Sequence, residues 1–258
     1  MLKQDRKTYL IHIQYLGIRL HGWAKQTGLK TVHERIDKSI AFVFGHSEFK
    51  TMGSSRTDAK VSANTANFAL MVSRFLNENE FLKELNNNLP PDIKALSVAL
   101  QKDGFNALQP DKIKTYLYLF ACNQKAHPFS SALMTTVLYD LDIELMKRGA
   151  ELFNGEHDFC NYVTKPNDNT QTNRFVLESK VMVNTFYNAN FFPEKSFAFV
   201  ISSKGFMRNQ VRLIMGQLFK LGKGETDLDF IEHSLKARLE KPLREIAPSS
   251  GLILQGLD

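Results

Sequence analysis

The sequence is poor in cysteine, and this shortage limits the kinds of protein that it can encode. Only Cys122 and Cys160 occur among 258 residues, far apart and without paired spacing. This argues against a disulfide scaffold and against a zinc site built on cysteine pairs, and it favours a reducing compartment. The seven histidines form no His-x-x-x-His pattern and no cluster with acidic neighbours. We therefore expect no metal site.

Long apolar runs are also missing. No stretch approaches the ~18 apolar residues that a membrane-spanning helix requires. The segment Met1–Lys7 is charged and precedes a strand-like pattern, so no secretory signal is visible. Short repeats and low-complexity segments are not found either. These absences predict a soluble, cytoplasmic protein without a membrane partner.

Positive charge is in excess. The chain has 33 Lys+Arg against 27 Asp+Glu, which gives a net charge of +6. This excess favours a polyanionic partner such as a nucleic acid. A mildly basic enzyme that acts on a small substrate agrees with the charge equally well.

The length suits one large domain or two small ones. Residues 103–110 are interpreted as the crossing between two units, each with a mixture of strands and helices. We assign residues 1–108 to an N-terminal subdomain and residues 109–258 to a C-terminal subdomain.

Hydrophobic periodicity in the first hundred residues predicts an α+β structure. Residues 9–16 alternate between apolar and polar side chains, which is typical of a half-buried strand. Thr31 and Glu34 form a capping box before apolar residues at helical spacing, and Gly45 marks the end of that helix. Further patterns indicate strands at 48–52, 66–72 and 93–100 and a helix around 81–89. The order β-α-β-β-α-β predicts an antiparallel sheet.

The second half continues this mixture. Strands are expected at 115–121, 175–184 and 196–203, a turn with a closing strand at 247–254, and helices at 141–153, 205–221 and 227–239. His157 and Asp158 are expected in a structural loop, because neighbours in sequence rarely form a catalytic dyad. Arg208 and Arg212 are four residues apart in the predicted helix, so they would share one of its faces.

The stretch Gly53–Ser62 holds the first candidate site residues. It contains no long apolar side chain before Val61, so we expect a loop that presents Arg56 and Asp58. In an extended backbone, residues two apart point the same way, so both side chains would face one cleft. On this pattern alone, a solvated surface or a helix cap at Asp58 is an open alternative.

Two aromatic residues have alternative interpretations. Trp23, the only tryptophan, either anchors the core or faces RNA beside Lys25 and Gln26. Tyr116 belongs to a strand with an aromatic face that is expected to pack, although one ring can still line a cleft.

Seven motifs resemble those of the tRNA pseudouridine synthases of the TruA type. In chain order and at that family's spacing they are Gly22–Gln26, Ser55–Ala59, Asn86–Ile93, Tyr116–Tyr118, Glu156–Phe159, Gly205–Arg212 and Ala247–Leu252. The resemblance implies the pseudouridine synthase fold, in which two similar α/β subdomains with mainly antiparallel sheets join around a central basic cleft. It also implies a homodimer that isomerises uridine to pseudouridine at positions 38 to 40 of the tRNA anticodon stem-loop.

The resemblance assigns roles to individual residues. Asp58 matches the family's nucleophile, and Arg208 matches the basic partner of that aspartate, with Arg212 as a further helper. Tyr116 matches the tyrosine that stacks on the target base. Arg56 matches the arginine that helps to hold the flipped-out nucleotide.

The implied reaction needs few groups. Breaking an N-glycosidic bond and rejoining the ring through carbon requires a positioned carboxylate, room for the detached base to turn and exclusion of water. It requires no metal and no redox cofactor. A base within a stem must first leave the stack, which calls for an aromatic platform and cations that hold phosphates. An arginine ion pair would keep Asp58 ionised as the pH falls.

The sequence departs from the family in two places. Lys60 and Ser62 stand where the family has glycine and histidine, and a glycine is the residue most free to take positive φ, so the loop is expected to bend differently. Asn106 and Leu108 stand where the family has histidine and arginine. The alternative hypothesis is a divergent member that binds tRNA without modifying it; a metabolic enzyme acting on a small substrate is a third class.

Overall fold

The computed structural model describes residues 6–108 and 111–257. These residues form two compact units, which are described separately. The first contains the described residues up to Leu108 together with Leu254–Gly256, and the second contains Asp111–Ile253 together with Leu257. Of the predicted crossing at residues 103–110, positions 109 and 110 lie outside the described residues.

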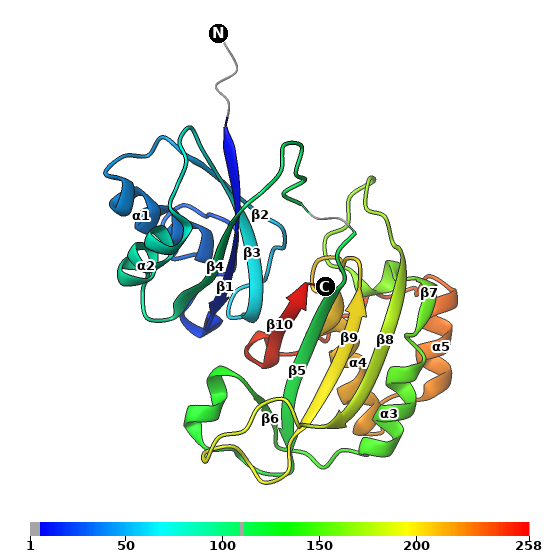
Figure 1. Cartoon of the computed structure of the whole chain (residues 1–258). Coiled ribbons are helices and arrows are strands. Elements are labelled where there is room, and N and C mark those ends of the chain that lie inside the picture. The colour runs from blue at the N-terminus through cyan, green and yellow to red at the C-terminus, as the bar shows by residue number, and fades with distance from the viewer. Residues whose placement is uncertain (1–5, 109–110, 258) are drawn as a thin grey trace. The chain divides into compact units, whose positions relative to one another are not determined.

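The first unit is built on an antiparallel sheet in the order β4-β1-β3, with β2 paired to β3 (Figure 1). The strands are β1 (Lys7–Tyr15), β2 (Lys50–Gly53), β3 (Ser62–Val72) and β4 (Ile93–Leu100). Alternate residues of β1, from Tyr9 to Tyr15, are buried as the pattern predicted. A 3-10 turn at Gly17–Arg19 follows β1.

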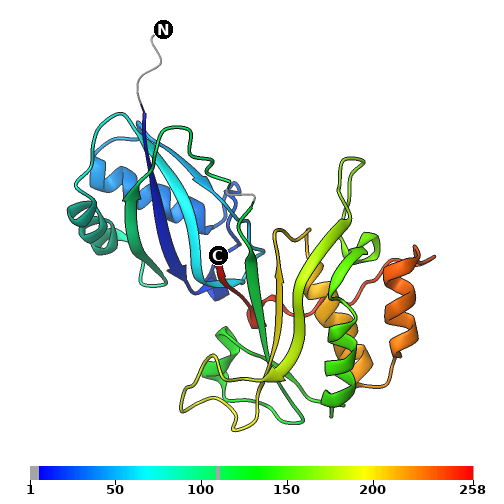
Figure 2. The same cartoon turned by 45° about the vertical axis from the view of Figure 1, so that its right-hand side comes forward.

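Two helices, α1 (Val32–Phe44) and α2 (Glu78–Asn88), lie side by side against one face of this sheet (Figure 2). Ile36 and Ile40 of α1 are buried, and the ring of Phe44 stacks on that of Phe81 of α2 with centroids 5.3 Å apart. The capping box is present, because the Thr31 hydroxyl accepts a hydrogen bond from the Glu34 amide.

The second unit has an antiparallel sheet in the order β5-β9-β8-β7. Its strands are β5 (Lys114–Cys122), β7 (Gly155–Asp158), β8 (Asn173–Val183) and β9 (Phe197–Ser203). The short β6 (Thr135–Val137) pairs with β5 in parallel, and β10 (Leu252–Leu257) is also a neighbour of β5. Short 3-10 turns occur at Pro128–Ala132, Cys160–Tyr162 and Ser249–Gly251.

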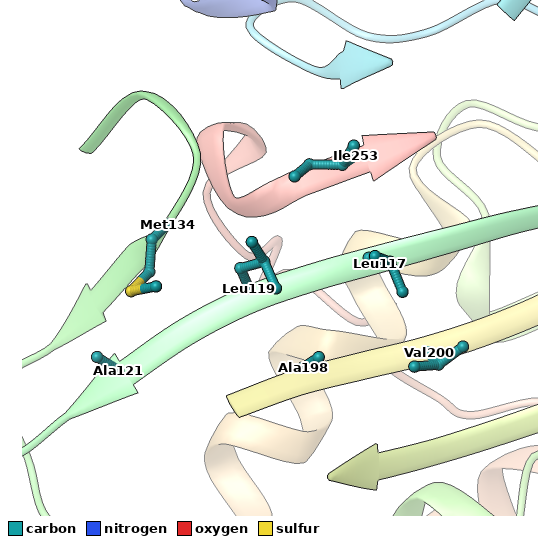
Figure 3. Packing of buried hydrophobic residues seen from close by; sticks show 7 residues of the cluster. All are labelled: Leu117, Leu119, Ala121, Met134, Ala198, Val200 and Ile253. Carbon is teal, nitrogen blue, oxygen red and sulfur yellow. The ribbon is translucent and has the colours of Figure 1, made fainter. Parts of the chain in front are cut away.

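Both faces of β5 are buried. On one face, α3 (Ile143–Glu151), α4 (Gln210–Gly222) and α5 (Leu228–Lys236) cover the sheet (Figure 2), and Phe219 of α4 meets Tyr118 edge-on at 5.9 Å. On the other face, a cluster of buried apolar side chains packs together (Figure 3). Its members are Leu117, Leu119, Ala121, Met134, Ala198, Val200 and Ile253.

The expectation of a mixed fold with mainly antiparallel pairing is confirmed. Two local expectations are wrong. His157 and Asp158 belong to β7 rather than to a loop, because that segment pairs with β8 in the register His157↔Arg174. The helix expected from residue 205 begins only at Gln210. Within the described ranges, no helix is long and apolar enough to span a membrane.

The cap of α1 gives a stability prediction. Thr31→Ala removes the acceptor of the Glu34 amide and should lower the free energy of unfolding by about 1 kcal/mol. Thr31→Ser keeps that oxygen and should cost less. The measurement is denaturant unfolding followed by the fluorescence of Trp23, which is buried in the same unit. Equal losses in the two variants would show that the hydroxyl is not the stabilising group.

Candidate active site

The backbone of the loop around Asp58 is held by the segment that follows β1. The Trp23 amide donates to the Thr57 carbonyl at 3.0 Å, and the Lys60 amide donates to the Leu20 carbonyl at 2.9 Å. The Gly17 amide donates to the Ser62 hydroxyl at 2.9 Å. Because these bonds lie on both sides of Asp58, its backbone position is fixed.

The same segment also connects to α1. The amides of Val32 and His33, at the start of that helix, donate to the carbonyls of Gly22 and Trp23 at 3.0 and 3.1 Å. These amides are among those that a helix leaves without an internal partner. The backbone of Gly22 and Trp23 therefore links the start of α1 to Thr57.

Gly22 approaches the loop too closely to carry a side chain. A Cβ atom there would lie 2.6 Å from the Thr57 carbonyl oxygen and 3.0 Å from the carbonyl carbon of Asp58, and the residue has φ of +83°. Only glycine fits both the contact and this backbone conformation.

Thr57 turns inward between two outward-facing residues. It is buried, and its hydroxyl lies 2.8 Å from the Tyr15 hydroxyl. Burial raises the pKa of Tyr15 far above its ordinary value, so the phenol stays neutral. Arg56 is exposed and Asp58 is partly exposed. The alternation expected of an extended segment thus separates the anchor, Thr57, from the two candidate site residues.

A tight turn follows the aspartate. The Val61 amide donates to the Asp58 carbonyl at 3.3 Å, and Lys60, at the third position of this turn, has φ of 67°. The lysine itself takes the positive φ that glycine adopts most freely. For a residue with a Cβ atom this conformation costs about 1–2 kcal/mol. The expected difference in bend from the family's loop stays a prediction.

Trp23 is a core anchor. Its ring is buried, stacks on His33 at 5.5 Å and lies against Gly53, where a Cβ atom would come within 2.3 Å of the indole. Burial lowers the pKa of His33, with the Asp37 carboxylate opposing the shift. Of the two open alternatives, the core position is the one that the structure shows.

Lys25 and Gln26 brace their own loop. The Lys25 ammonium forms an ion pair with Asp37 of α1. The Gln26 side-chain amide donates to the His21 carbonyl at 3.0 Å. Their suggested contacts with RNA stay a prediction.

In the second unit, Tyr116 and Arg208 occupy different surroundings. Tyr116 lies in β5, opposite Ile201 of β9, and its largely buried ring meets Phe206 edge-on at 5.4 Å. Arg208 lies in the turn before α4 with an exposed side chain, and its carbonyl accepts a hydrogen bond from the Thr164 amide at 3.3 Å.

Arg208 and Arg212 do not share a helical face, contrary to the expectation. Asn209 between them has φ of 59° and ψ of 8°, so helical spacing starts only after it. Arg212, in the first turn of α4, donates through Nε to the Ala247 carbonyl at 2.8 Å and through Nη1 to Asn209 Oδ1 at 3.1 Å. Its hydrogen bonds therefore connect Ala247 to the start of α4.

Sequence reasoning missed two buried polar groups next to these residues. The Ser55 hydroxyl and the Gln210 side-chain nitrogen are buried and have no hydrogen-bond partner within the described residues. Gln210 Oε1 accepts from the Met207 amide at 2.9 Å. Nothing in their sequence context separates them from ordinary surface serine and glutamine; only burial reveals them.

Asp58, Arg56, Lys25 and Gln26 belong to the first unit, and Tyr116, Arg208 and Arg212 belong to the second. Over the two described ranges, no group of three or more His, Cys, Asp or Glu residues is arranged to hold a metal ion.

Comparison with known proteins connects both units to one family. A family model described as tRNA pseudouridine synthase matches residues 150–257. The chain is 31% identical over 251 residues to tRNA pseudouridine synthase A of Dictyoglomus thermophilum, covering 96% of this chain and 98% of that protein. The chain belongs to the tRNA pseudouridine synthase A family. Members of this family are isomerases.

Other members show similar coverage. A tRNA pseudouridine synthase A 2 of Bacillus cereus is 32% identical over 254 residues, which is 97% of this chain and 98% of the relative. A tRNA pseudouridine synthase A of Clostridium botulinum is 28% identical over 243 residues, or 94% and 96%. The likeness to the tRNA pseudouridine synthase A family therefore extends over both units.

The turn after Asp58 gives a second stability prediction. Lys60→Gly should leave the free energy of unfolding unchanged or raise it by up to about 1 kcal/mol, because glycine takes positive φ without a Cβ clash. Lys60→Val should lower it by about 1–2 kcal/mol, since β-branched residues fit this region poorly. Chemical denaturation of the two variants measures the difference.

An exposed lysine in a helix provides the control. At Lys83 of α2, glycine should be less stable than valine, because helix interiors disfavour glycine more than valine. The same order of stabilities at both positions would contradict the left-handed conformation of Lys60.

Proposed function

We propose that this tRNA pseudouridine synthase A family member isomerises uridine to pseudouridine at positions 38 to 40 of the tRNA anticodon stem-loop, with Asp58 as the nucleophile. The observation that carries the proposal is the way in which hydrogen bonds position the backbone around Asp58. The backbone on both sides of it is held by hydrogen bonds with residues 17–23, while its side chain stays partly exposed. A carboxylate fixed in this way avoids the entropic cost of being positioned during the reaction.

The reaction is balanced without a second substrate. The bond between N1 of uracil and C1′ of the ribose breaks, and a bond between C5 and C1′ forms. The proton of C5 leaves, and N1 gains one. Because nothing is oxidised or reduced, the reaction consumes no redox cofactor, and the chain's own residues supply its groups.

Arg56 is suited to hold the flipped-out nucleotide. Its side chain is exposed two residues before Asp58, and it forms no ion pair within residues 6–108 and 111–257. A guanidinium in this state can donate to phosphate without first losing another partner. Extruding a base from a stem leaves phosphates and a ribose that need such contacts.

The other site residues complete the proposal. Arg208 acts as the second catalytic residue, Tyr116 supports the target base, and Arg212, Lys25 and Gln26 contribute to RNA binding. For Arg212 the contribution is through position, because its bonds to Ala247 and Asn209 fix the turn that carries Arg208. We further propose that the protein acts in the cytoplasm as a homodimer.

Replacing the carboxylate tests the proposed function. Asp58→Asn keeps the size and removes the charge, so tritium release from tRNA labelled at C5 of uridine should fall by at least about 1,000-fold. Binding of the same tRNA should change by only a few-fold. Asp103→Asn, at an exposed aspartate of the same unit, is the control and should keep full activity.

Two outcomes would contradict the proposal. Full tritium release by Asp58→Asn would remove Asp58 from the chemistry. A wild-type protein that binds tRNA but releases no tritium would instead support the divergent binding protein. Mapping of the product to a position outside 38 to 40 would correct the target alone.

A further inference from the structure

Lys60 combines three properties that, among the lysines that the structure describes, only Lys165 shares. It occupies a left-handed backbone conformation with φ of 67°, its side chain is exposed, and it forms no ion pair with any residue that the structure describes. Its amide donates a hydrogen bond to the Leu20 carbonyl, which fixes the backbone of the turn. The side chain is therefore held at the surface by a rigid backbone.

Glycine would satisfy this backbone at lower energetic cost. A side chain retained at a strained position next to a site indicates that the side chain is used. The strain is local, since Lys60 follows Asp58 by two residues and lies within the turn that begins at the Asp58 carbonyl.

The surroundings of Lys60 favour an anion. Asp58 is the only acidic residue in 53–66. Residues 15–23, which form hydrogen bonds with this loop, include no acidic residue. Arg56 in the same loop is a second exposed cation without an ion pair among the described residues. This loop thus carries two exposed cations, Arg56 and Lys60, two residues before and two residues after Asp58. Neither cation forms an ion pair with a described residue.

We propose that Lys60 binds a phosphate of the RNA backbone adjacent to the nucleotide held at Asp58. The proposal rests on the proposed function of Asp58. An ammonium on a flexible stem is a point charge that suits phosphate without demanding a fixed geometry. A base edge, in contrast, would call for the directional pairing that amides and guanidinium groups provide.

The experiment measures tRNA binding at several salt concentrations. Lys60→Gly and Lys60→Asn both tolerate the left-handed conformation and remove the charge, and Lys60→Arg keeps the charge. Losing one phosphate contact should weaken binding several-fold at low salt. It should also reduce the slope of log K against log salt by about 0.7–0.9. The arginine variant should bind like the wild type.

Steady-state kinetics adds a second readout. In the glycine and asparagine variants, KM for tRNA should rise several-fold while kcat changes much less, because the lost contact binds RNA without reaching the reacting atoms. Lys83→Gln, which removes an exposed charge from α2, is the matched control and should leave the salt slope unchanged.

Some results would overturn the proposal. A wild-type salt slope in Lys60→Gly would do so, because that variant keeps the turn and lacks only the side chain. An equal loss in Lys83→Gln would show that general charge, and no defined contact, is responsible. The comparison can be repeated with Asp58→Asn as the parent protein, where binding is measured without turnover. It therefore reports on Lys60 even if Asp58 proves to have no role in the chemistry.

Discussion

The structure of the candidate site depends on a two-residue stretch of backbone, Gly22 and Trp23. Their carbonyls accept the first amides of α1, and the Trp23 amide donates to Thr57. Such amides at a helix start need an external partner, and here the partner is the segment that also holds the loop around Asp58. The position of Asp58 is therefore a consequence of how α1 begins. The indole of Trp23 strengthens this arrangement, because it fills the space beside Gly53 and stacks on His33.

Much of the fold was predictable because its signals are local. The capping box at Thr31, the alternation in β1 and the stop of α2 before Pro90 each depend on a few neighbouring residues, and each appears as expected. The start of α4 was not predictable in the same way. The apolar spacing after Met207 continues the helical pattern, but Asn209 in the left-handed conformation interrupts the backbone. Periodicity records which side chains are buried, and it does not record such a dihedral angle.

The resemblance predicts Arg56 and Asp58 as site residues, and these roles stay a prediction. The groups that hold their loop come from distant positions such as Tyr15 and Gly22, which no local pattern indicated. Lys60 illustrates the limit most clearly. A missing glycine suggests a changed turn, but Lys60 takes a positive φ itself, at the cost of local strain. Only the three-dimensional structure shows this backbone conformation.

The pairing of β1 with β3 contains an irregularity between Ile13 and Tyr15, where Ile13 faces Ala66 and Tyr15 faces Ala63. One extra residue in β3 is thus accommodated immediately before the strand end that carries the Tyr15 hydroxyl to Thr57. Without this bulge, Ser62 and Ala63 at the start of β3 would lie one step out of phase with β1, because side chains alternate along a strand. Insertions or deletions near this point would therefore change the site by shifting strand phase, even if every side chain of the loop were kept.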